Sequence, residues 1–180
     1  MQAVFCVTFV CMGNICRSPT AHGVFRQKLS DVGLTRQVRV ESAGTHDLHR
    51  GEGADRRSQR HAQQRGYDLS DLRARPLDAR DFARSDLLLV MDWDNLRAAE
   101  ERCPPEHRHK LRRLTEFCLR HSSETVPDPY YGGVAGFEHV LDLIEDACNG
   151  LLDHVQREVA QRGSAGAPKA PQGAGRGTDT

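Results

Sequence analysis

Short apolar runs and polar stretches follow one another along the chain in an order that predicts strands. Two apolar runs, at residues 4–10 and 86–91, are rich in β-branched residues or leucine, and residues 38–43 (VRVESA) predict another strand. Continuous runs of this kind are typical of strands buried on both faces of a parallel sheet. A weaker pattern predicts a fourth strand within residues 110–117.

Between and after these runs, apolar residues recur at helical spacing. The predicted helices or helical turns span residues 18–31, 54–66, 78–83, 92–102 and 137–159. Ser18 and Asp92 are expected to cap the helices that they precede, because their side-chain oxygens can accept the unpaired N–H groups of a first turn. The last helix is the longest and is amphipathic.

Strands that alternate with helices predict one α/β domain, a three-layer sandwich with a four-stranded parallel sheet and helices on both faces. We expect this domain to cover residues 1–162. Residues 163–180 are rich in Gly, Ala and Pro and are predicted to form a disordered tail. Ligands of such folds bind beyond the carboxyl ends of the strands, so the loop after the first strand is the first candidate site.

Composition excludes several classes of protein. The 25 Lys and Arg residues balance the 25 Asp and Glu residues, which argues against a dedicated nucleic-acid-binding protein. No apolar run approaches the roughly 18 residues of a membrane span, and residues 1–6 lack the basic start of a signal peptide. We therefore expect no membrane insertion and a cytoplasmic location, with the six cysteines reduced.

The loop after the first strand carries the candidate chemistry. Cys11 is followed by five residues and then by Arg17. Backbone N–H groups of the loop and of the following helix can converge on an anion. Gly13 and Asn14 suit the left-handed turns that such a loop needs. The second Gly and the Lys of an ATP-binding loop are missing, so nucleotide hydrolysis is not indicated.

A cysteine in such a cradle is a candidate nucleophile. The N–H dipoles and the Arg17 cation both favour thiolate over thiol. The Arg17 guanidinium can also hold two oxygens of a phosphoryl group as a planar fork. The same donors stay engaged as charge redistributes, so the spacing indicates phosphoryl transfer through Cys11.

Residues 10–19, VCMGNICRSP, resemble the signature of the low-molecular-weight protein tyrosine phosphatases. Three further segments match in the same order: residues 40–45 (VESAGT), 89–92 (LVMD) and 128–132 (DPYYG). The similarity extends from about residue 4 to residue 159. A Cys-x5-Arg motif alone occurs in unrelated phosphatase folds, so the combination carries the specificity.

The resemblance implies a phosphatase that hydrolyses phosphotyrosine through a phosphocysteine intermediate, with no metal or cofactor. Cys11 is implied as the nucleophile and Arg17 as the residue that holds the phosphoryl group. Asp128 is implied as the general acid for the leaving phenolate and then as the base that activates water. The implied partner is a phosphotyrosine protein, for example a bacterial tyrosine kinase, with phosphate as product. A monomer is expected.

The resemblance also implies a set of substrate-binding residues around the loop. The set is Met12, Gly13, Asn14, Ile15, Cys16, Ser18, Ser42, Leu48, His49, Tyr130 and Tyr131. Asn14 is expected to form a hydrogen bond with Ser42 and so to fix the shape of the loop. The Ser18 hydroxyl is expected to stabilise the Cys11 thiolate. Tyr130 and Tyr131 are expected to form one wall of an aromatic slot. Leu48 and His49 lie where the family varies its substrate preference.

Two other activities use the same fold. Protein-arginine phosphatases usually have Thr where this chain has Ile15, which favours phosphotyrosine here. An arsenate reductase needs additional cysteines near the third strand to relay oxidation, and residues 78–94 contain none.

Two alternative functions, zinc binding and the binding of a charged partner, are suggested by clusters of residues in the sequence. The candidate zinc ligands are Cys103, His107, His109, Cys118 and His121, and their spacing fits no standard zinc finger. The basic run at residues 107–113 and the three arginines Arg56, Arg57 and Arg60 are typical of a solvated face. They could also guide an acidic substrate protein.

Several positions in this chain depart from the family's pattern. Leu72 stands where His is usual, so the loop is expected to be supported differently, with a loss of rigidity as one outcome. His22 replaces a common Glu and is expected at the surface. Met12 is a volume-tolerant replacement.

Cys16 either forms a reversible disulfide with Cys11 or points into the core, and both interpretations stay open.

Overall fold

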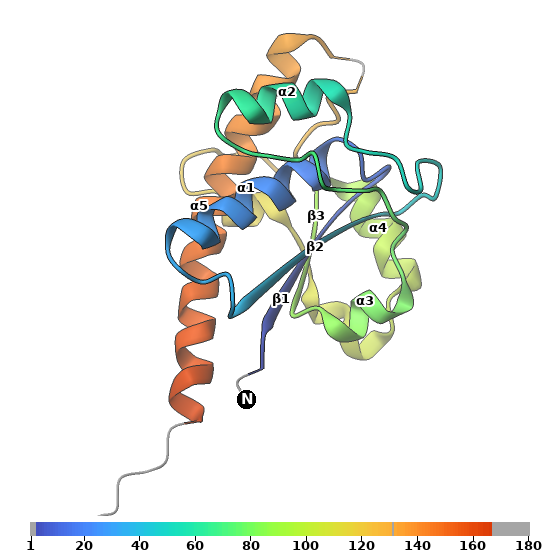
Figure 1. The fold of residues 1–180 in the computed structure, drawn as a ribbon. Coiled ribbons are helices and arrows are strands. Elements are labelled where there is room, and N and C mark those ends of the chain that lie inside the picture. The colour runs from blue at the N-terminus through green and yellow to red at the C-terminus, as the bar shows by residue number, and fades with distance from the viewer. Residues whose placement is uncertain (1–2, 131, 167–180) are drawn as a thin grey trace, which may run out of the picture.

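The computed structural model describes residues 3–130 and 132–166, and its centre is a four-stranded parallel sheet (Figure 1). The strands are β1 (Phe5–Cys11), β2 (Val38–Gly44), β3 (Leu87–Val90) and β4 (Leu111–Arg113), in the order β2-β1-β3-β4. Cys11 pairs with Gly44 of β2, and its neighbour Val10 pairs with Val90 of β3. The carboxyl ends of three strands therefore meet at one edge, as the predicted fold requires.

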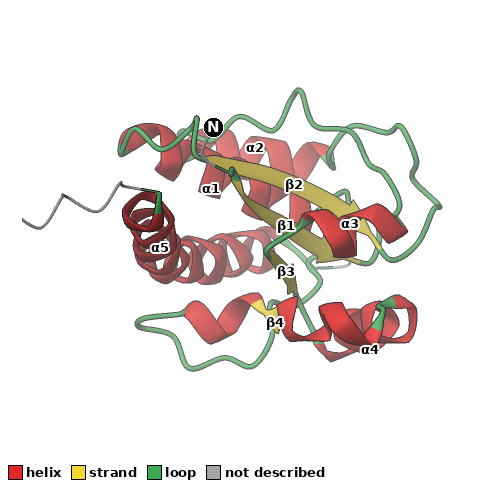
Figure 2. Cartoon of the chain, turned by 90° about the horizontal axis from the view of Figure 1, so that it is seen from below, coloured by secondary structure: helices red, strands yellow, loops and turns green. Residues whose placement is uncertain are grey.

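Helices cover both faces of this sheet, which confirms the predicted architecture. They are α1 (Arg17–Asp31), α2 (Arg56–Gln64), α3 (Ala79–Arg84), α4 (Trp93–Arg102) and α5 (Val134–Ala165). In Figures 1 and 2 the sheet lies between α1 and α5 on one side and α3 and α4 on the other. Helix α2 packs against α1 and α5.

Alternation along β1 explains the two layers. Phe5, Val7 and Phe9 point into the larger apolar core beneath α1 and α5. Val10 points into the smaller core beneath α3 and α4, where it joins Phe82. Successive side chains of a strand face opposite sides, so one apolar run supplies both cores and places Cys11 at its buried end.

The structure corrects the predicted start of the first helix and the predicted start of the tail. Helix α1 begins at Arg17, so Ser18 lies inside its first turn and does not cap it. Helix α5 continues to Ala165, so residues 163–165 of the predicted tail are helical, and residues 167–180 lie outside the described part of the chain. The predicted cap at Asp92 is confirmed, since its carboxylate accepts the N–H of Asn95 at 2.7 Å.

The fourth strand is shorter than its pattern predicts. Only three residues pair with β3, and the flanking segments form the 3-10 helices η1 (Pro105–Lys110) and η2 (Leu114–Phe117). Within residues 3–130 and 132–166, no helix has the length and apolar character needed to cross a bilayer.

Candidate active site

The loop between β1 and α1 is clamped against the end of β2. Cys11 is the last residue of β1 and is only 3% exposed. Asn14 adopts a positive φ of 55°, as the sequence suggested for this position. A Cβ atom added to Gly44 would lie 2.7 Å from the carbonyl oxygen of Met12, so only glycine allows this close approach. The N–H of Thr45 donates to the Cys11 carbonyl at 2.9 Å.

Behind the loop, a chain of hydrogen bonds ends on the Cys11 sulfur. The Arg75 N–H donates to Asn14 Oδ1 at 3.0 Å, and Asn14 Nδ2 donates to Ser18 Oγ at 2.7 Å. Ser18 Oγ lies 3.0 Å from Cys11 Sγ. Because Asn14 donates into the Ser18 oxygen, the hydroxyl hydrogen of Ser18 is available to the sulfur.

The predicted bond between Asn14 and Ser42 is wrong, because Arg75 and Ser18 occupy both polar atoms of the Asn14 side chain. Ser42 Oγ instead lies 3.0 Å from His22 Nδ1. His22 is therefore half-buried rather than fully at the surface, and partial burial lowers its pKa to about 4, with the charge of Arg26 adding to the effect.

Leu72, in the position where the family usually has His, takes no part in this polar support. It is 9% exposed and packs in an apolar cluster with Ala54, Ala62 and Leu69. The N–H of Arg75, a few residues further along the same extended segment, holds the loop through Asn14 instead.

Arg17 is buried and faces both the cradle and the opposite wall. Its Nη1 donates to Asp92 Oδ2 at 2.6 Å and to the Val126 carbonyl at 3.0 Å. Its Nη2 lies 3.8 Å from Asp128 Oδ2.

The sequence predicts Asp92 only as a helix cap, and its bond to Arg17 was not predicted. The signal was its position directly after β3, because parallel strands end at one edge of the sheet.

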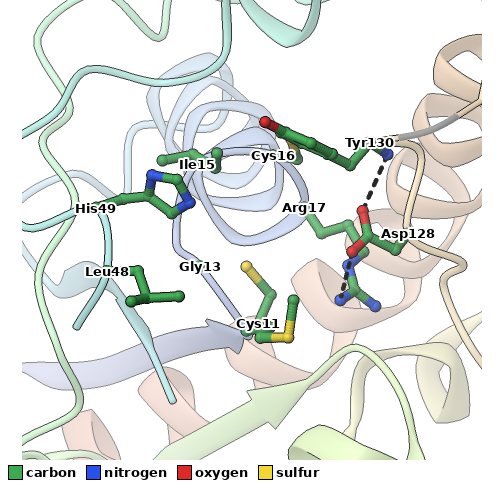
Figure 3. Close-up of a pocket in the computed structure, with 10 residues that line it drawn as sticks. Cys11, Gly13, Ile15, Cys16, Arg17, Leu48, His49, Asp128 and Tyr130 are labelled. Atoms are coloured by element: carbon green, nitrogen blue, oxygen red, sulfur yellow. Dashed lines mark hydrogen bonds and ion pairs between the residues drawn. The ribbon is translucent and has the colours of Figure 1, made fainter. Parts of the chain in front are cut away.

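Asp128 lies across the cavity from the cradle, and its side chain is 41% exposed. Its Oδ1 accepts the N–H of Tyr130 at 3.0 Å, which leaves Oδ2 facing Arg17 (Figure 3). The segment that carries it is tied to the end of β3, since the Val126 N–H donates to the Met91 carbonyl at 2.7 Å.

These groups surround a cavity of about 230 Å³ (Figure 3). Ten of the residues named from the sequence line it: Cys11, Met12, Gly13, Ile15, Cys16, Arg17, Leu48, His49, Asp128 and Tyr130. Asn14 and Ser18 stand behind the loop, and Ser42 lies further away, beside His22. Tyr131 lies outside the described residues.

Cys16 is a second thiol in the wall of the cavity, and it is 5% exposed. Burial raises its pKa to about 12, and the negative charge of Asp55 adds to the effect. Cys16 is therefore a protonated thiol at neutral pH.

Among residues 3–130 and 132–166, no three His, Cys, Asp or Glu side chains are grouped as a metal site requires. His121, one of the five candidate zinc ligands, lies 2.9 Å from the Asp146 carboxylate through its Nδ1.

A buried thiol at the start of a strand-to-helix loop, with a guanidinium and a carboxylate lining the same cavity, suits phosphoryl transfer through a cysteine. The fold and the site together therefore define the class of protein, which is an α/β cysteine-dependent phosphatase. The family model described as low molecular weight phosphotyrosine protein phosphatase matches residues 6–161. The chain belongs to this family and is a protein-tyrosine phosphatase, as the sequence predicted.

Known proteins are similar over almost their whole length. The low molecular weight protein-tyrosine-phosphatase of Streptomyces coelicolor is 43% identical over 159 residues, which are 87% of this chain and 96% of that protein. A protein tyrosine phosphatase from Entamoeba histolytica, solved with Hepes in its active site, superposes with a TM-score of 0.83 at 38% identity, covering 86% and 98%. YfkJ from Bacillus subtilis superposes with a TM-score of 0.81 at 31% identity, covering 87% and 97%.

Proposed function

We propose that Cys11, Arg17 and Asp128 carry the hydrolysis of phosphotyrosine. The Cys11 thiolate attacks phosphorus while Arg17 holds two phosphoryl oxygens. The P–O bond to tyrosine breaks as the S–P bond forms, and Asp128 gives its proton to the leaving phenolate oxygen. The products of this step are a phosphocysteine and a free tyrosine side chain.

The second step returns the enzyme to its starting state. Asp128, now a carboxylate, takes a proton from a water molecule whose oxygen bonds to phosphorus. The S–P bond breaks, so phosphate is released and the thiolate is restored. Ser18 supports both steps because its hydroxyl can stabilise negative charge on the sulfur.

The observation that carries this assignment is the position of Arg17. Its Nη2 lies 3.8 Å from Asp128 Oδ2, and Arg17, Asp128 and Cys11 all line one cavity. A phosphoryl group held there meets the sulfur on one side and the carboxyl group on the other.

The cavity favours a long aromatic phosphoester. Cys11 is buried at its base, so a short side chain such as phosphoserine would not reach the sulfur as readily. Tyr130, Ile15 and Leu48 supply apolar wall for the aromatic ring. Ile15 offers no polar partner for the guanidinium of phosphoarginine, which supports phosphotyrosine as the substrate.

The proposed partner is a phosphotyrosine protein, with a bacterial tyrosine kinase as one candidate, and the proposed form is a monomer. A reducing compartment suits the chemistry, because oxidation would consume a nucleophilic thiol. All six cysteines are free thiols here, which supports a cytoplasmic location. Cys16, which lines the same cavity as Cys11, is the candidate partner for a reversible disulfide.

The test uses phosphotyrosine and phosphoarginine peptides with three variants. Cys11→Ser should abolish turnover and keep phosphate binding. Asp128→Asn should slow phenyl phosphate far more than the activated ester p-nitrophenyl phosphate. Asp47→Asn removes an exposed carboxylate that is paired with Arg50, and is the matched control that should retain activity. Turnover by Cys11→Ser, or faster hydrolysis of phosphoarginine, would refute the assignment.

A further inference from the structure

The segment that leads to Asp128 is held at Glu124 by three other parts of the fold. The Glu124 carbonyl accepts from Arg113 Nη1 and from Thr115 Oγ1, each at 2.7 Å. The Glu124 carboxylate accepts from Trp93 Nε1 at 3.3 Å. We call these four residues the Glu124 anchor.

The donors of the Glu124 anchor are themselves fixed. Arg113 ends β4, and its guanidinium stacks over the Trp93 ring at 4.1 Å. Its backbone N–H donates to the Glu116 carboxylate at 2.8 Å. Thr115 is buried in η2, so water competes little for its bond to the carbonyl. The carbonyl of Glu124 therefore has one donor on a buried side chain, Thr115, and a second donor, Arg113, whose bond is exposed to solvent.

From the Glu124 anchor the chain runs directly into the active site. Val126 is fully buried, donates to the end of β3 and accepts from Arg17 at 3.0 Å. Asp128 follows between Pro127 and Pro129, whose rings restrict φ to a narrow range. A shift of the backbone before Pro127 is then passed on to Asp128, because few torsions remain to absorb it.

The Asp128 side chain has little support of its own. It is 41% exposed, one oxygen accepts the N–H of Tyr130 two residues on, and the other lies 3.8 Å from Arg17. Its place above the cavity is therefore set mainly by the backbone that precedes it. That backbone is held by the Glu124 anchor and by Val126.

We propose that Thr115 and Arg113 are positioning residues for the general acid. By holding the Glu124 carbonyl, they keep the Asp128 carboxyl group within hydrogen-bond reach of the leaving oxygen. This inference rests on the proposed function, which makes Asp128 the acid. Because both bonds end on one carbonyl, loss of either donor loosens the backbone before Asp128 and loss of both loosens it further, while Val126 still bonds to Met91 and Arg17.

The experiment compares kcat/KM for phenyl phosphate and p-nitrophenyl phosphate. Thr115→Val removes a donor without changing shape, and Arg113→Met removes the other. Each single variant should lose about tenfold on phenyl phosphate and under about twofold on p-nitrophenyl phosphate. The double variant should lose about 100-fold or more on phenyl phosphate, since a general acid contributes about 10²- to 10⁴-fold. Inhibition by inorganic phosphate should stay unchanged, because the cradle is intact.

Two variants serve as matched controls. Thr115→Ser keeps the hydroxyl and should behave as wild type. Glu124→Gln changes the side chain and keeps the carbonyl, so its effect on phenyl phosphate should be under about threefold. If Thr115→Val does not fold, Arg113→Met carries the same test at a residue that is only half-buried.

The outcomes separate this inference from the proposed function. Equal losses on both esters, or weaker phosphate inhibition in step with the loss, would show a general structural role and overturn it. Asp128→Asn is measured beside the variants. If it shows the leaving-group dependence and neither single variant does, only the anchor inference fails. If Asp128→Asn lacks that dependence, the acid assignment fails and the inference fails with it.

Discussion

His22 is a half-buried imidazole whose protonation should destabilise the fold. Burial is the largest cause that lowers the pKa of His22 to about 4, and the positive charge of Arg26 lowers it further. The negative charges of Glu41 and Asp71 act in the opposite direction. The unfolded chain binds the proton with the ordinary pKa of 6.5. Stability is therefore complete above pH 6.5 and is lost as the pH falls towards 4, because the unfolded state then binds more protons.

The size of the effect follows from these two values. At pH 5 the unfolded chain is mostly protonated at His22, whereas the folded chain is mostly neutral, which corresponds to a ratio of about 30 in the folding equilibrium. The loss between pH 7 and pH 5 is about 2 kcal/mol. Gln can bond to Ser42 and does not titrate. His22→Gln should thus lose about 2 kcal/mol less than wild type over this range.

The assay is urea unfolding of wild type and His22→Gln at pH 7, 6 and 5. Other titrating groups cancel in the difference between the two proteins. Ser42→Ala is the control: it removes the partner and keeps the half-buried imidazole, so its pH dependence should match that of wild type. If the free energies of wild type and His22→Gln run parallel from pH 7 to pH 5, the half-buried neutral imidazole is ruled out.

Three further substitutions test other parts of the molecule. Ser18→Ala removes the hydroxyl 3.0 Å from the Cys11 sulfur, a bond to a charged group worth about 1.5–3 kcal/mol, so kcat should fall by about 10- to 100-fold. Rapid-mixing kinetics should show a larger burst as phosphocysteine accumulates, and an unchanged kcat would contradict this role. Gly44→Ala places a methyl group 2.7 Å from the Met12 carbonyl oxygen and should weaken inhibition by phosphate about tenfold or more through a displaced cradle. Unaltered inhibition would contradict the close packing. Burial alone would raise the pKa of Asp146, but the N–H groups of residues 119–121 and the His121 ring outweigh it and hold the pKa at about 2. Asp146→Asn should therefore lower the free energy of unfolding at pH 7 by about 2 kcal/mol. The deficit should shrink as the pH falls from 3.8 towards 2, and urea unfolding that gives the same deficit at pH 7 and pH 3 would refute it.

The buried strands were readable because parallel strands covered on both faces need a continuous apolar run. β1 and β3 have such runs, whereas β2 lies at an edge of the sheet and includes exposed and half-buried polar residues. β4 was only partly readable, because its three residues are half-buried at the edge of the sheet and share their segment with two 3-10 helices. The prediction that Ser18 caps the helix is wrong. A serine before a helical pattern usually acts as the N-cap, but here the helix begins one residue earlier, at Arg17.

The residues of the candidate site could be predicted from the sequence where they lie close together along the chain. Cys11 and Arg17 are separated by one short loop between a strand and a helix, so their spacing alone indicates an anion cradle. Asp128, the proposed general acid, was predicted from the family resemblance, because a residue on a distant loop leaves no local signature. The partners of His22 and Asn14 were missed, since they depend on how α1 packs against segments far along the chain.

By itself, the sequence determined the alternating α/β architecture and the candidate anion-binding loop, because both follow from periodicity and from short-range geometry. Only the tertiary structure decided what surrounds the cradle. Arg17 bonds to Asp92 across 75 residues and to Val126 across 109 residues, and both contacts depend on the order of the strands in the sheet. The positions of Asp128 and of the Glu124 anchor follow from the same strand order, which no local pattern encodes.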